Sequence, residues 1–153
     1  MYRAPVSRVD VSKWTSAAAA LIAAAFIYYA WRTPALAMFG WAESLGLGGA
    51  IAALRLHAAA IVLPDPVLYS VPDALWQYAF AFVVFRLSSP ARGLERALWW
   101  AIPIVIGVGL ELLQLARLIE GTFDPMDLAL GILAIAIASG VAGRDLPVKE
   151  SST

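Results

Sequence analysis

Long apolar runs dominate the chain, and four of them predict membrane-spanning helices. They cover Trp14–Trp31, about Asp73–Leu87, Ala97–Ile119 and about Pro125–Ala142. Roughly 20 apolar residues in a helix cross the hydrocarbon core of a bilayer, and the second run reaches that length only if Val67–Val71 extends it. The pattern predicts an all-α membrane protein with four transmembrane helices in a single domain, residues 1–153.

The first apolar run has two interpretations. Lys13 precedes it, as a basic residue precedes the apolar part of a secretory signal. No convincing cleavage pattern of small residues follows Tyr28–Trp31, however. We therefore expect a retained membrane anchor.

The segment between the first two runs is ambiguous. Leu45–Leu63 is apolar enough for a fifth span, but Arg55 and His57 lie near its centre. A fifth span would also move Arg92 and Arg96 to the outer side of the membrane. We expect instead an outer-surface helix at about Gly48–Leu63 that lies in the interface or folds back over the bundle.

Basic residues indicate the orientation of the four spans. With a cytoplasmic N-terminus, eight of the 11 Lys and Arg residues are cytoplasmic: Arg3, Arg8, Lys13, Arg86, Arg92, Arg96, Arg144 and Lys149. The outer side holds Arg32, Arg55 and Arg117. This bias predicts that both termini are cytoplasmic. The outer side then holds many acids: Glu43, Asp65, Asp73, Glu111, Glu120, Asp124 and Asp127.

Composition agrees with a membrane protein and narrows its chemistry. The chain is 61% hydrophobic and 14% charged, with a formal net charge of +0, so nothing indicates nucleic-acid binding. It has no cysteine and one histidine, His57, which cannot form a histidine-rich metal site alone. No nucleophile elbow, zinc motif or phosphate loop is present in the sequence. We expect no catalytic residues, metal or cofactor.

Glu111 and Gln114 stand out inside the third apolar run. On a helix, Gly107, Glu111, Gln114 and Leu118 share one face, and a glycine there leaves room for another helix. A span that ends at Ile119 puts Glu111 about 12 Å below the outer boundary. Glu111 either bonds to a neighbouring helix, with Arg117 or Arg55 as a candidate partner, or belongs to a functional site.

Two helix starts explain part of the acidity. Asp124-Pro125-Met126-Asp127 predicts an N-cap at Asp124 with proline in the first helical position. Ser70-Val71-Pro72-Asp73 matches a capping box, in which Ser70 caps the helix and Asp73 reaches back. A capping side chain can still line a site.

Three motifs in this order resemble the VanZ-like family. They are Val71-Pro72-Asp73 before an aromatic helix, Glu111-Leu112-Leu113-Gln114, and Phe123-Asp124-Pro125-Met126-Asp127-Leu128, and the resemblance covers about residues 67–143. It implies a small multi-pass protein of the bacterial inner (cytoplasmic) membrane. One member of that family confers teicoplanin resistance, and members generally lack an assigned activity.

The chain departs from the family pattern at four positions. The resemblance implies a basic residue, a histidine, an arginine and an asparagine where this chain has Ala74, Gln77, Gly121 and Gly131. Arg117 lies one helical turn before Gly121. These losses favour a repurposed scaffold over a retained enzyme.

Two functional hypotheses follow. In the first, a cell-envelope protein presents an outward polar cluster to a lipid-linked or glycopeptide-like molecule. The candidate ligand-binding cluster consists of Asp73, Gln77, Glu111, Gln114, Arg117, Asp124 and Asp127. In the second, the chain is a non-catalytic accessory subunit of a larger membrane protein complex. Membrane lipids are expected partners in both.

Overall fold

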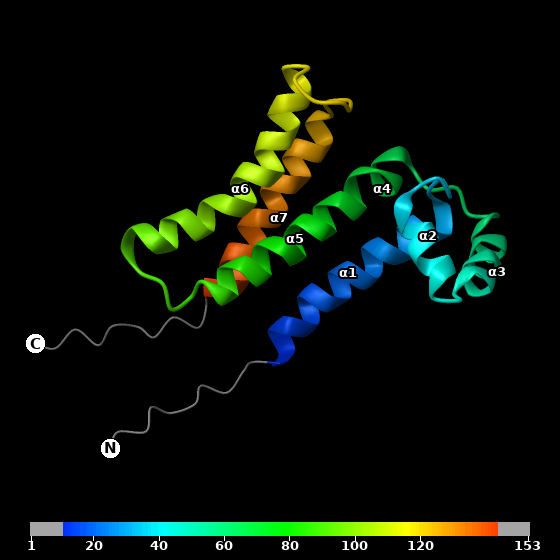
Figure 1. The fold of residues 1–153 in the computed structure, drawn as a ribbon, viewed down its shortest axis with the longest axis horizontal. Coiled ribbons are helices and arrows are strands. Elements are labelled where there is room, and N and C mark those ends of the chain that lie inside the picture. The colour runs from blue at the N-terminus through cyan, green and yellow to red at the C-terminus, as the bar shows by residue number, and fades with distance from the viewer. Residues whose placement is uncertain (1–10, 144–153) are drawn as a thin grey trace, which may run out of the picture.

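The computed structural model describes residues 11–143, and these residues form seven helices joined by short turns (Figure 1). The helices are α1 (Val11–Trp31), α2 (Ala37–Ser44), α3 (Gly48–Ala58), α4 (Asp65–Leu68), α5 (Ser70–Leu87), α6 (Gly93–Leu115) and α7 (Pro125–Gly143). The predicted all-α class is confirmed for this part of the chain.

Four helical segments are long and apolar enough to cross a membrane, as in a multi-pass membrane protein. They are Trp14–Trp31, Asp65–Leu87, Gly93–Leu115 and Pro125–Gly143. The second segment reaches its length because α4 runs almost directly into α5. The same continuity makes the predicted capping box wrong: the residue before α5, Tyr69, has helical backbone angles, and no side chain caps α5.

The third span begins and ends four residues earlier than expected. After Leu115, the N–H of Leu118 donates to the Leu113 carbonyl and the N–H of Arg117 to the Gln114 carbonyl, both at 2.9 Å. This is the Schellman ending of a helix, and Arg117 takes the left-handed position with φ 57°. Glu111 therefore lies about one turn, roughly 6 Å, from the end of α6 rather than 12 Å.

The core of the bundle lies between α1, α5 and α7. Small residues dominate it, and Phe82 and Phe85 of α5 supply the large buried rings. On α7 the contact stripe is Ala134, Ala138 and Ala142, which are buried at a four-residue spacing. Because small side chains let backbones approach closely, these helices pack through alanine.

The helix α6 lies against this core and is the least buried of the four spans. It bends along its length (Figure 1), and Pro103, which cannot donate to the preceding turn, lies within it. Gln77 Nε2 on α5 donates to the Pro103 carbonyl oxygen at 2.7 Å. A side-chain bond from α5 therefore joins the two helices at the proline.

The short helices α2 and α3 are docked on the C-terminal end of α1. Arg55 of α3 donates to the carbonyl oxygens of Tyr29 (3.1 Å) and Arg32 (2.8 Å), which have no partner within α1. Trp31 Nε1 donates to the Ile61 carbonyl oxygen at 2.9 Å. The expected helix after Gly48 is present but ends at Ala58, and Arg55 caps α1 rather than pairing with Glu111.

The two ends of the bundle differ in what they carry. The start of α1, the end of α7 and the α5–α6 turn lie at one end, whereas α2, α3 and the α6–α7 turn lie toward the other (Figure 1). Arg86, Arg92 and Arg96 lie around the α5–α6 turn. The other basic residues that we assigned to that side are outside the described part, or lack a described side chain: Arg3, Arg8, Lys13, Arg144 and Lys149.

Candidate functional site

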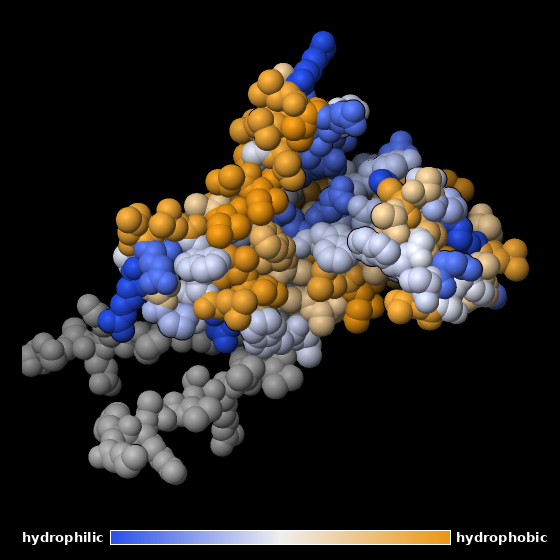
Figure 2. Space-filling view, in the orientation of Figure 1, coloured by the Kyte–Doolittle hydropathy of each residue, from blue (hydrophilic) through white to orange (hydrophobic). Residues whose placement is uncertain are grey.

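An open cleft of about 660 Å³ lies between the pair α1 and α5 and the pair α6 and α7. Hydrophilic residues gather in the hollow between these pairs, and apolar side chains cover much of the visible surface around it (Figure 2). Five of the seven residues in the predicted cluster line the cleft: Asp73, Gln77, Glu111, Gln114 and Asp127. The structure thus brings together most of the polar residues that the sequence singled out.

On the α1–α5 side, an aromatic and acidic group forms the wall. The Tyr28 hydroxyl donates to Asp73 Oδ1. The guanidinium of Arg32 lies 5.3 Å from the Tyr28 ring centre and 4.5 Å from that of Tyr69. These contacts hold Tyr28 at the cleft and place a positive charge close enough to interact with Asp73.

On the α6 side, the polar face predicted from the sequence is turned toward the cleft. Gly107, Glu111 and Gln114 all line it, whereas Leu118 lies beyond the helix end and is exposed. A Cβ atom at Gly107 would lie 2.5 Å from Gln77 Nε2. Gly107 is therefore the position where α5 and α6 meet closely, as the sequence predicted.

Two of the acids that line the cleft are poorly paired. Glu111 Oε2 and Asp127 Oδ1 are both buried and have no hydrogen-bond partner. Glu111 interacts with the backbone N–H of Asp124 and is repelled by Asp127, Asp124 and Asp73. The expected ion pairs from Glu111 to Arg55 or Arg117 are not formed. A buried oxygen that accepts no hydrogen bond lowers the stability of the folded chain.

Asp124 and Arg117 belong to the ends of helices rather than to the cleft lining. Asp124 Oδ1 accepts the Met126 N–H at 2.8 Å, and its carbonyl accepts the Leu128 N–H at 3.2 Å. The predicted N-cap of α7 is therefore confirmed. Arg117 is exposed in the turn after α6.

The positions that depart from the VanZ-like pattern shape the same cleft. Ala74, Gln77 and Gly131 line it, so small residues stand where two polar ones were expected. Gly121 has φ 132°, and a Cβ atom there would lie 2.6 Å from Gln114 Nε2. An arginine cannot stand at this position without moving Gln114 or the turn.

Sequence reasoning missed the aromatic lining of the cleft, which consists of Tyr28, Trp76 and Phe80. It also missed Arg32, whose guanidinium lies over the Tyr28 ring. The sequence predicts Arg32 only as an outer charge, and it predicts no role for Tyr28. Trp76 and Phe80, 45% and 37% exposed, line the apolar part of the cleft from α5. Each lies three residues after a polar member of the predicted cluster, Asp73 or Gln77. This helical spacing places them near one face of α5, and it was the available signal.

The lining supplies binding chemistry of two kinds. One end offers hydrogen-bond acceptors and negative charge, and the other offers apolar and aromatic side chains. Within residues 11–143, no group of His, Cys, Asp and Glu could hold a metal ion. No family model, curated protein or solved structure matches the chain. The function is therefore argued from the geometry of the cleft.

Proposed function

We propose that this chain is a VanZ-like protein of the bacterial cytoplasmic membrane that binds an amphipathic molecule without catalysing a reaction. The head of a lipid-linked or glycopeptide-like molecule occupies the acidic end of the cleft. Its donors, a protonated amine above all, meet the carboxylates there. Its apolar part lies along the aromatic end.

The observation that supports this proposal most strongly is the pair of unpartnered carboxylate oxygens in the cleft. Glu111 Oε2 and Asp127 Oδ1 are buried without donors, in two helices that are long and apolar enough to cross a bilayer. Ionisable groups in membrane spans usually face a cavity and mark a pathway or ligand site. A donor on a bound molecule would satisfy both oxygens, and a cation would offset the repulsion from Asp73.

The proposed orientation puts the cleft on the outer side of the membrane. Arg86, Arg92 and Arg96 cluster at the opposite end of the bundle, which we assign to the cytoplasm together with both termini. Helix α3 has 11 residues and is about 16 Å long, too short to cross a bilayer. We assign α2 and α3 to the outer interface.

A second candidate function is that of an accessory subunit, and α6 favours it. The helix is the least buried span, and a Cβ atom at Gly109 would meet only its own helix. Leu112 and Leu113 flank this position and are exposed. A glycine within an exposed apolar helix face is typical of a helix–helix contact with another protein.

A thermal-stability experiment tests the first proposal. The purified chain in nanodiscs is unfolded with dodecylamine, with laurate, or with neither. The amine raises the unfolding temperature because it binds the folded cleft, whereas the anion does not. Glu111→Gln removes the amine effect, and Glu120→Gln, an acid in the exposed α6–α7 turn, keeps it.

Two results would overturn the binding proposal. One is an equal shift with amine and laurate, and the other is an amine shift that survives Glu111→Gln. The accessory role is tested separately by purification from native membranes in mild detergent. A stoichiometric partner that is lost with Gly109→Leu supports it, and elution as a free chain argues against it.

A further inference from the structure

A second cavity of about 430 Å³ lies beside the cleft, between α1, α2 and α5. Ala25 and Tyr29 of α1 and Met38 and Trp41 of α2 contribute to its lining. The Tyr29 hydroxyl is already used, because it donates to the Met38 carbonyl oxygen at 3.2 Å. The cavity therefore presents aliphatic, aromatic and thioether surface, and methionine adapts readily to the shape of an apolar occupant.

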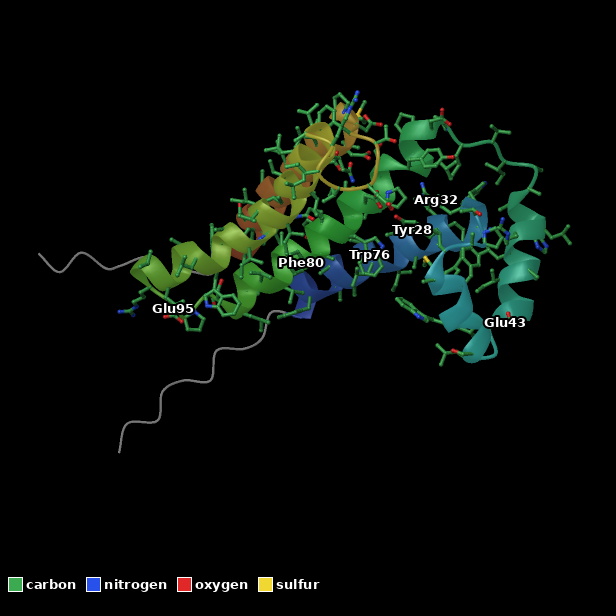
Figure 3. The ribbon with its side chains drawn as sticks, turned by 45° about the horizontal axis from the view of Figure 1, so that its top comes forward. Tyr28, Arg32, Glu43, Trp76, Phe80 and Glu95 are labelled. Atoms are coloured by element: carbon green, nitrogen blue, oxygen red, sulfur yellow. The ribbon has the colours of Figure 1, made fainter. Side chains whose placement is uncertain are left out.

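Tyr28 and Trp76 stand between this cavity and the cleft, because both residues line both spaces. Figure 3 shows them near each other on neighbouring helices. Asp73 and Arg32 hold Tyr28 in place. Trp76 is 45% exposed. Among the described residues, no aromatic ring or cation contacts its indole, whereas the Arg32 guanidinium lies over the Tyr28 ring. Trp76 is thus a weakly held part of the wall between a polar and an apolar space.

We infer that the cleft and this tail cavity form one elongated site for a membrane amphiphile with a single alkyl chain. The head lies at Asp73, Glu111 and Asp127, and the chain passes Trp76 into the space beneath α2. This inference rests on the proposed function for the head. We assign an alkyl chain to the cavity because the cavity lining is apolar, whereas the adjoining cleft holds the charged side chains.

Photocrosslinking locates the chain directly. The full chain in nanodiscs is irradiated with a dodecylamine analogue that carries a diazirine on its terminal carbon, and adducts are mapped by peptide mass spectrometry. Adducts are expected at Met38, Trp41 and Trp76. Ala25→Phe puts a ring into the cavity, and we expect it to lower these adducts about tenfold, which corresponds to a loss of about 1.4 kcal/mol in binding. Ala18→Phe, on an exposed part of α1, leaves them unchanged.

If Ala25→Phe does not fold, a second pair of variants tests the same inference. Trp41→Ala removes an exposed wall of the cavity and also lowers adducts at Met38. As its control, Trp99→Ala removes an exposed indole from α6 that does not line the cavity, and it leaves the adducts at Met38 unchanged. Adducts scattered over α6, or joined to a second copy of the chain, would overturn the inference.

The two proposals fail in different ways. If the amine shift depends on Glu111 but the adducts avoid the tail cavity, the head site stands and the elongated site is wrong. If no Glu111-dependent shift occurs, the proposed function fails and this inference fails with it. Adducts in the cavity that disappear with both Glu111→Gln and Ala25→Phe support both proposals.

Discussion

The buried carboxylates of the cleft carry an energetic cost that can be measured one residue at a time. Glu111 Oε2 has no partner, and three other acids repel its carboxylate. Glu111→Gln keeps an acceptor for the Asp124 N–H and removes the charge. We expect it to stabilise the folded chain by less than about 1 kcal/mol, because it removes the repulsion from three acids at a carboxylate that is only partly buried. The free energy of unfolding in mild detergent measures this.

Glu111→Leu and Glu120→Gln complete the test at this residue. Leucine also removes the charge but leaves the Asp124 N–H without its acceptor, so its gain is smaller than that of glutamine. Glu120 is exposed, and its substitution changes stability by less than about 0.5 kcal/mol. A loss of stability in Glu111→Gln would mean that the carboxylate has a stabilising partner, contrary to our interpretation of the cleft.

Arg117 is the one non-glycine residue with positive φ among residues 11–143. A left-handed conformation costs a residue with a Cβ atom roughly 1–2 kcal/mol. Arg117→Gly should therefore raise the free energy of unfolding by about 1 kcal/mol. Arg117→Ala loses the same charge but keeps Cβ, and it should give no such gain. If both variants gain equally, the effect comes from charge rather than from the helix ending.

At the scale of helices, the start of α7 depends on the side-chain oxygen of Asp124. Asp124→Ala removes the acceptor for the Met126 N–H and should cost about 0.5–2 kcal/mol. Asp124→Asn keeps that acceptor and should cost much less. The yield of folded protein and its thermal unfolding report the difference. Equal damage from Asn and Ala would show that the charge is required and that the capping account fails.

The contact between α5 and α6 depends on a glycine and a glutamine together. Gly107→Ala forces a methyl group against the Gln77 amide and weakens its bond to the Pro103 carbonyl. We expect a cost of about 1–3 kcal/mol, as in overpacked cores. Adding Gln77→Ala should remove most of that cost, so the two changes are not additive. Additive losses in thermal unfolding would place the strain elsewhere.

The ends of a helix could be predicted where residues next to them in the sequence determine them. They were predicted less well where the local pattern does not determine them. Asp124-Pro125 determines the start of α7 through its own backbone, and the sequence predicted it. Ser70 was misassigned because α4 continues into α5, which a capping pattern cannot reveal. The end of α6 was misplaced because apolar residues continue past the Schellman turn, so hydrophobicity alone gave no stop.

At the scale of the whole molecule, the cleft is a product of packing between segments far apart in the chain. Glu111, Gln114 and Asp127 were predicted to lie at the same end of the bundle, because α6 and α7 are consecutive helices joined by one turn. Tyr28 bonds Asp73 across 45 positions, and no local pattern indicates that pair. Arg55 was a candidate partner for Glu111, but its guanidinium donates instead to two carbonyl oxygens at the C-terminal end of α1. The sequence therefore predicted the acids of the cleft but not the aromatic residues that line it beside them.

Single-cysteine labelling tests the proposed orientation of the whole bundle, and the chain has no cysteine to remove first. Ser89 lies in the α5–α6 turn beside the arginines that we assign to the cytoplasm, and Ser44 ends α2 on the opposite side. In intact cells, a membrane-impermeant maleimide should label Ser44→Cys and spare Ser89→Cys. After permeabilisation both should react, which controls for access. Equal labelling of both in intact cells would contradict the four-span arrangement and favour Leu45–Leu63 as a fifth span.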